Sequence, residues 1–118
     1  MDDRVLRLRV GVVVLAAAMI MTASPAEASS VVGKASSILI LANGLVFFNM
    51  SGTRTTSPSC AAGLPLRWVF NGATAAGQAR LSLLLTAYST GKSLQIIGTG
   101  ACTDWNDTET MDYFQTQD

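Results

Sequence analysis

The chain has 118 residues, with 8 basic and 8 acidic side chains, no histidine and two cysteines. Without histidine it lacks the commonest general base and metal ligand, which excludes Ser-His-Asp and Cys-His catalytic arrangements and mixed Cys/His zinc sites. A net charge of zero argues against nucleic acid as the main partner, because phosphate binding requires a surplus of Lys and Arg.

Residues 1–28 have the pattern of a secretory signal peptide. A basic start, Met1–Arg9, precedes an uncharged apolar run at 10–21, and Ala26-Glu27-Ala28 places small residues at −3 and −1 of a cut after Ala28. A membrane anchor is the alternative, but the run is shorter than the roughly 20 residues that a spanning helix needs. We therefore expect a secreted or periplasmic protein with one domain at 29–118 and no membrane span after cleavage.

The two cysteines, Cys60 and Cys102, are expected to form a disulfide, because export places them where disulfides form and persist. The bridge would close a loop of about 42 residues and contribute roughly 3–4 kcal/mol in the chain-entropy model. A reactive thiol is the alternative, but it needs a base or a helix terminus nearby, and none is evident.

The first half of the mature chain predicts a hairpin followed by a loop. Small and polar residues at 29–37 predict a loose arm, and the run Ser36–Leu41 predicts the first strand. Asn43-Gly44 is typical of a tight hairpin turn, and Leu45–Met50 forms the returning strand. The stretch Ser51–Pro65, rich in Gly, Ser and Pro, is typical of an exposed loop.

Three further strands are predicted in the second half, at Leu66–Phe70, Ser93–Gly98 and Glu109–Gln115. In the first of these, alternation places Leu66, Trp68 and Phe70 toward the core. The acidic alternation of the last strand favours an edge position in the sheet.

The single predicted helix spans Ala75–Ser89, with turn and N-cap residues at 71–74 and Gly91 at the position after the helix. Its apolar arc is wider than that of a lone surface helix, so it is either deeply packed or also meets another subunit. The element order is β-β-β-α-β-β, which is mainly β and matches the OB-fold, a small, partly open barrel of five strands. An open five-stranded sheet with one helix across it has the same order.

The segment Leu81–Gly98 resembles the helix-to-strand passage in the B subunits of pentameric bacterial toxins of the subtilase-cytotoxin and typhoid-toxin type. In those subunits a leucine-rich helix ends in an aromatic-x-Thr-Gly turn and runs into a strand, here Tyr88–Gly91 followed by Leu94–Ile97. The resemblance implies an exported, disulfide-bonded OB barrel that is not an enzyme and binds cell-surface glycans as a ring of five. Residues 102–109 also look like part of small secreted bacterial proteins without an assigned function.

Three residues are candidates for ligand binding. Trp105 lies between acidic residues, including Asp107, and an aromatic ring stacks on the apolar face of a sugar while carboxylates accept bonds from its hydroxyls. The alternative is that Trp105 covers the disulfide. Arg54 lies in the hydroxyl-rich segment Ser51–Ser59 and would contact an acidic sugar, although exposed loops generally have this composition.

Acidic residues cluster near the end of the chain, at Asp104, Asp107, Glu109 and Asp112. Paired carboxylates serve acid–base catalysis or calcium binding, but the spacing does not match an EF-hand loop, so we favour a solvated edge or turn. We therefore expect no metal and no cofactor.

The interpretation that follows is an exported, non-enzymatic binding domain, because every common nucleophile–base pairing lacks a member. The expected partner is a cell-surface glycan or another protein, in a homo-oligomer such as a pentamer. The alternative class is a small secreted inhibitor, or another protein-interaction module, that uses a loop such as Ser51–Ser59.

Overall fold

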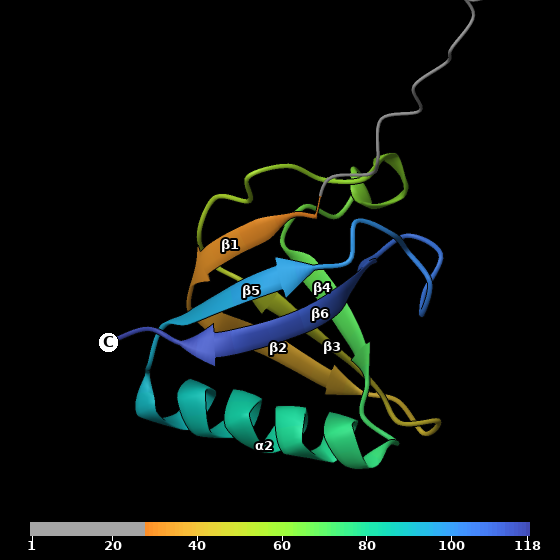
Figure 1. Ribbon diagram of the computed structural model, residues 1–118. Helices are drawn as coiled ribbons and strands as arrows, with labels where there is room; N and C mark the ends of the chain where they lie inside the picture. The colour runs from red at the N-terminus through yellow and green to blue at the C-terminus, as the bar shows by residue number, and fades with distance from the viewer. Residues whose placement is uncertain (1–27) are drawn as a thin grey trace, which may run out of the picture.

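A computed structural model describes residues 28–118, which form one curled β-sheet with a helix beneath it (Figure 1). The predicted signal peptide lies outside the described residues, apart from Ala28. In chain order the elements are β1 (Ser30–Gly33), β2 (Ala35–Ile40), β3 (Leu45–Met50), the short 3-10 helix η2 (Ser59–Ala61), β4 (Arg67–Asn71), α2 (Ala75–Thr90), β5 (Leu94–Gly98) and β6 (Glu109–Thr116).

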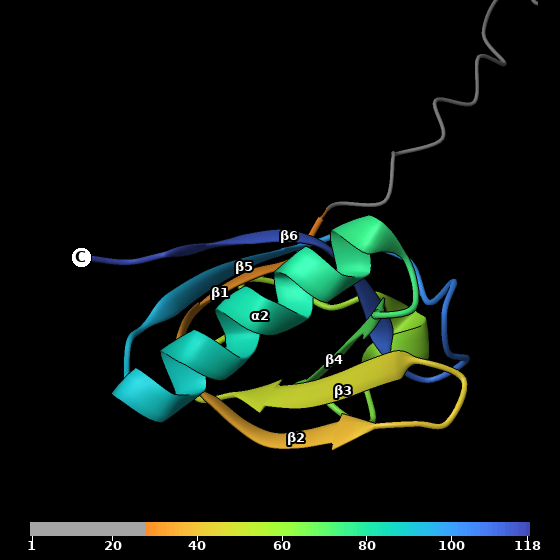
Figure 2. The ribbon, with the colours of Figure 1, turned by 90° about the horizontal axis from the view of Figure 1, so that it is seen from below.

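The strand order β1-β5-β6-β4-β3-β2 shows how the sheet curls. Its two end strands, β1 and β2, are separated in sequence by Lys34 alone, so the ends of the sheet must approach each other. They do so around Ser51, whose N–H donates to the Lys34 carbonyl and whose Oγ accepts from the Lys34 N–H, both at 2.9 Å. Figure 2 shows β1, β5 and β6 on one side of the barrel and β2 and β3 on the other.

Taken as two halves of one bent strand, β1 and β2 give five strands in the Greek-key order of the OB-fold. The helix then lies between the third strand, β4, and the fourth, β5. Every neighbouring pair is antiparallel except β4 and β6, which are parallel. The expected mainly β, OB-like barrel with one helix is confirmed; the hydrogen-bonded sheet itself is not a closed cylinder.

The barrel interior is filled by alternate residues of the strands, as the period of two requires. Trp68 and Phe70 of β4 face inward together with Val46, Phe48 and Met50 of β3. The ring of Phe70 packs against that of Phe48 with centroids 6.0 Å apart. The helix α2 lies beneath the barrel in Figure 1, and its Leu84 and Ala87 belong to the same buried core.

The boundaries of α2 follow from its caps. Thr74 Oγ1 accepts a hydrogen bond from Gly77 N at 2.9 Å, which satisfies one of the free N–H groups at the start of the helix. Gly91 ends it in the left-handed conformation, with φ of 69°. The expected helix is therefore confirmed, one residue longer than predicted. Its apolar arc is only partly covered, because Leu85 and Tyr88 remain 43% and 55% exposed.

Three local expectations are wrong. Residues 29–37 are not a loose arm, since β1 pairs with β5 along its whole length and Val31 is buried. The last strand is not an edge, because β6 lies between β5 and β4. Leu66 precedes β4 and is half exposed instead of facing the core.

Candidate functional site

The outer face of β2, β3 and β4 carries a second apolar cluster, opposite the barrel interior. Leu39, Phe47 and Val69 are register neighbours across these three strands. Although they face outward, Phe47 and Val69 are 4% and 0% exposed. Trp105, from the connection 99–108 between β5 and β6, packs edge-on against Phe47 with ring centroids 5.3 Å apart. Trp105 itself keeps 39% of its surface exposed.

A polar group adjoins this cluster. The guanidinium of Arg67 lies over the Phe47 ring, 5.0 Å from its centroid. Its Nη2 is 2.6 Å from Asp107 Oδ1, and its Nε donates to Thr108 Oγ1 at 2.8 Å. The Thr108 hydroxyl in turn donates to Asp107 Oδ1 at 3.0 Å. Asp107 is therefore fixed in orientation while its side chain remains 52% exposed.

We call the surface formed by Leu39, Leu41, Phe47, Arg67, Trp105 and Asp107 the Trp105 face. All of these residues except Asp107 line a hollow of about 150 Å³. A larger hollow of about 370 Å³, bounded by residues 63–66 and Asn49, also includes Arg67. The two hollows thus meet at Arg67.

The position of the Trp105 face on the barrel is the one through which OB-folds commonly bind ligands. These folds use the face of their second and third strands together with the loops that follow the first and fourth strands. Here those strands are β3 and β4, the first loop supplies Leu41, and the second supplies Trp105 and Asp107.

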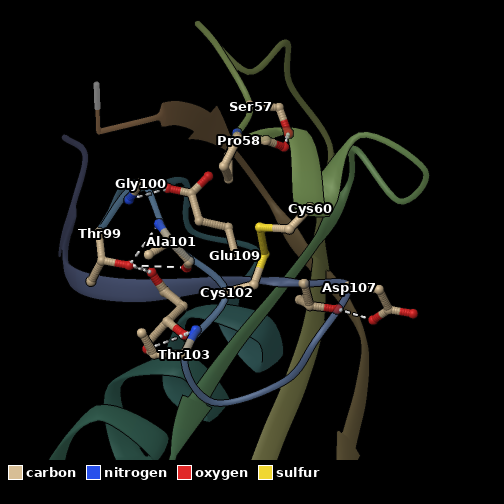
Figure 3. Close-up of a disulfide and its surroundings, with 12 residues drawn as sticks. Ser57, Pro58, Cys60, Thr99, Gly100, Ala101, Cys102, Thr103, Asp107 and Glu109 are labelled. Carbon is tan, nitrogen blue, oxygen red and sulfur yellow. Dashed lines mark hydrogen bonds between the residues drawn. A yellow bond between two sulfur atoms is a disulfide. The ribbon is translucent and has the colours of Figure 1, made fainter. Parts of the chain in front are cut away.

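The expected disulfide is confirmed between Cys60 and Cys102, whose Cα atoms are 6.4 Å apart (Figure 3). It joins η2 to the connection that carries Trp105, and thereby anchors one wall of the Trp105 face. The aromatic ring that Trp105 contacts is that of Phe47, on the outer face of the sheet.

Glu109 is fully buried at the upper end of the barrel, beside the disulfide (Figure 3). Its Oε2 accepts from Gly100 N at 3.0 Å, and its Oε1 accepts from the Ser29 hydroxyl at 2.5 Å. The Nη2 atom of Arg54 lies 3.9 Å from Oε1. Glu109 therefore belongs to an internal polar cluster and not to a solvated edge.

Arg54 points into the barrel, away from solvent. Its guanidinium stacks on the Trp68 ring at 3.9 Å from the centroid, and its Nη2 donates to the Arg67 carbonyl at 3.2 Å. Burial lowers the pKa of Arg54, and the negative charge of Glu109 opposes this shift. The structure therefore brings Trp105 and Asp107 to one face and places Arg54 inside the barrel.

The remaining acidic residues do not form a metal centre. Asp104 is half-buried and Asp112 is exposed, while Glu109 is enclosed. Within residues 28–118, no three His, Cys, Asp or Glu side chains are grouped closely enough to hold a metal ion.

Sequence reasoning missed Phe47 and Arg67 as parts of the site. Alternation along their strands indicates that both face outward, which was the available signal. Their meeting with Trp105 depends on strand register and on the path of the 99–108 connection, which the sequence does not reveal.

Comparisons with protein-family models, with curated proteins and with solved structures find no match to this chain. Across the part of the chain that the structure covers, no helix has the length and apolar character needed to cross a membrane.

Proposed function

We propose that the chain is an exported, non-enzymatic binding domain that takes a carbohydrate on the Trp105 face. The observation that carries the proposal is the placement of a partly exposed Trp105 beside Asp107, whose orientation is fixed by Arg67 and Thr108. A fixed polar group beside an aromatic surface suits a sugar, which has apolar C–H faces and hydroxyl edges.

The available atoms favour a neutral sugar over an acidic one. Among residues 28–118, both hydrogen bonds that Asp107 accepts use Oδ1, so its Oδ2 is available to a ligand hydroxyl. The only cation on the face, Arg67, is already paired with Asp107, and Arg54 is enclosed. An acidic sugar would find no unpaired positive charge on this surface.

The test is a glycan array with the mature protein, followed by titration of the best ligand with two variants. Trp105→Ala removes the stacking surface, and Asp107→Asn removes the negative charge while it keeps the shape; each is expected to weaken binding at least about tenfold. Tyr113→Ala is the control, because Tyr113 is an aromatic residue on β6 that is 51% exposed, against 39% for Trp105, and lies outside the Trp105 face. Equal binding by all three variants, each shown to be folded, contradicts the proposal.

The resemblance to toxin B subunits supports a homo-oligomer, with a pentamer as the model case. Leu85 and Tyr88 on α2 are large apolar residues left uncovered within one chain, and their burial in a neighbour would stabilise an assembly. Light scattering at micromolar concentration measures the mass directly. A monomeric mass would remove this part of the proposal without affecting the carbohydrate site.

A protein partner is the second candidate, supported by the exposed Leu64 and Leu66 beside the larger hollow. Insertion of the segment 51–59 into an enzyme is less well supported, because Thr55 N donates to the Ser30 carbonyl at 2.9 Å and Arg54 points inward. The discriminating pair is Leu66→Asp and Trp105→Ala. If Leu66→Asp abolishes binding of the protein's natural partner and Trp105→Ala does not, a protein partner is favoured over a carbohydrate.

A further inference from the structure

Ser29 is anchored at the end of the barrel more firmly than its position before the first strand would require. It is completely buried, whereas Ala28 is exposed. Its carbonyl accepts from Gly98 N at 2.8 Å, and its hydroxyl donates to the buried carboxylate of Glu109 at 2.5 Å. The change from an exposed to a buried backbone therefore occurs between Ala28 and Ser29.

The same residue is marked independently by the sequence. The small residues Ala26 and Ala28 predict cleavage after Ala28, which makes Ser29 the first residue of the processed chain. Two unrelated observations, a cleavage pattern and a pattern of burial, thus coincide at one peptide bond.

We propose that Ser29 is the N-terminus of the working protein and that its α-ammonium group binds Glu109, so that cleavage supplies a second cation to the buried carboxylate. This inference rests on the export half of the proposed function and is independent of the carbohydrate site. The site is assembled from three distant parts of the chain, namely Ser29, Arg54 and Glu109.

Geometry places the new charge within reach of the carboxylate. The Ser29 nitrogen is within about 4 Å of its own Oγ by covalent dimensions alone, and that Oγ contacts Glu109. The existing cation does not saturate the carboxylate, since a separation of 3.9 Å between Arg54 Nη2 and Oε1 is too long for a hydrogen bond. Arg54 directs its hydrogen bonds to Ser57 and to the Arg67 carbonyl instead.

The burial of Ser29 also sets the order of signal-peptide cleavage and folding. A processing enzyme needs an exposed, extended chain on both sides of the bond that it cuts. The 28–29 bond meets this condition only before the barrel forms, so cleavage precedes folding. The folded product then holds its terminus out of reach of aminopeptidases.

The charged groups that face the terminus are Glu109 and Arg54, and Glu109 is the one that Ser29 contacts. Burial of Ser29 and the positive charge of Arg54 lower the pKa of the α-amino group, whereas the adjacent Glu109 carboxylate raises it. The proposal requires that the contact with the carboxylate prevail, so that the pKa lies above its ordinary value of about 7.7–8.0. A raised folded-state pKa stabilises the protein fully below the ordinary pKa, and this stabilisation disappears as the pH rises through the folded-state value.

The experiment compares two chains, one that starts at Ser29 and one that keeps Ala28, each released from a fusion without extra residues. The Ala28 chain is a fair comparator because Ala28 is exposed and fits the fold. At pH 6.5 the Ser29 chain should melt about 4 °C higher or more, and the difference should vanish by about pH 10. An Nα-acetylated Ser29 chain should behave as the Ala28 chain does.

A Glu109→Gln variant should abolish the difference between the two starts. Should that variant not fold, the acetylated chain decides the question alone. Equal melting temperatures of the free and acetylated chains at pH 6.5 overturn the inference. An exported protein whose mass shows a different first residue also overturns the inference, although export itself then stands. Glycan binding is measured separately, so failure of the carbohydrate proposal is distinguishable from failure of this inference.

Discussion

Two Arg–carboxylate pairs in this barrel have different energetic roles because their burial differs. Arg67 and Asp107 meet at the surface, where solvent screening limits such pairs to about 0–1 kcal/mol, so this pair fixes geometry more than it stabilises the fold. Arg54 and Glu109 are enclosed, so removal of either leaves an uncompensated charge in the interior.

We expect Glu109→Ala to reduce the free energy of unfolding by about 3–5 kcal/mol, because it leaves the Arg54 guanidinium buried without its carboxylate. Asp112→Ala is the matched control: it also removes a carboxylate from β6, but at an exposed position, and should change stability by less than about 0.5 kcal/mol. Urea denaturation measures both. Equal effects of the two substitutions would show that the buried pair does not stabilise the barrel.

Glycine is required at position 98 because a side chain has no room there, not because of its backbone conformation. A Cβ atom there would overlap the Glu109 carboxylate and approach Trp68 at 2.7 Å, so Gly98→Ala should displace the carboxylate and cost about 1–3 kcal/mol. A Cβ at Gly63 would meet nothing within 4 Å, and Gly63→Ala should be close to neutral. Thermal unfolding of both variants tests this, and a neutral Gly98→Ala would contradict it.

Among the elements, α2 depends on its N-cap. Thr74→Ala removes the hydroxyl that accepts from Gly77 N in the first turn and should cost about 1 kcal/mol. In contrast, Thr86→Ala changes an exposed mid-helix threonine to the best helix former and should be neutral or slightly stabilising. Chemical denaturation measures both. A destabilisation by Thr86→Ala equal to that by Thr74→Ala would rule out the capping explanation.

Elements whose signals are local could be predicted from the sequence. The hairpin around Asn43-Gly44 and the caps of α2 depend on neighbouring residues alone, and they were placed correctly. The positions of β1 and β6 could not be predicted in the same way, since their partners are remote in sequence and only the closure of the sheet brings them together.

The site was predictable to a similar extent. Trp105 and Asp107 are neighbours in sequence, so their grouping could be anticipated, whereas the support from Arg67 and Phe47 arises from tertiary contacts. Arg54 was expected on the surface because its segment has the composition of an exposed loop. A buried carboxylate and the Trp68 ring provide the internal partners that overcome this tendency.

At the scale of the whole molecule, the disulfide joins two segments that are 42 residues apart. Replacing both cysteines, Cys60→Ser with Cys102→Ser, should lower the free energy of unfolding by roughly 3–4 kcal/mol, the loop-closure contribution. Because the bridge also anchors the connection that carries Trp105, the proposed glycan binding should weaken under conditions where the variant is still folded. Unfolding curves and ligand titration check the two effects, and unchanged stability would contradict the first.

The central position of β6 determines when the sheet can be completed during folding. The strand is last in sequence, yet it alone joins β5 to β4, so the two sides of the barrel share no continuous ladder until it arrives. A chain that emerges with its N-terminus first, from the ribosome for example, therefore cannot complete the sheet until nearly its last residue has emerged, because β6 is still missing. If the chain is exported as proposed, this late closure would keep the polypeptide unfolded during translocation, so that the barrel forms only after export.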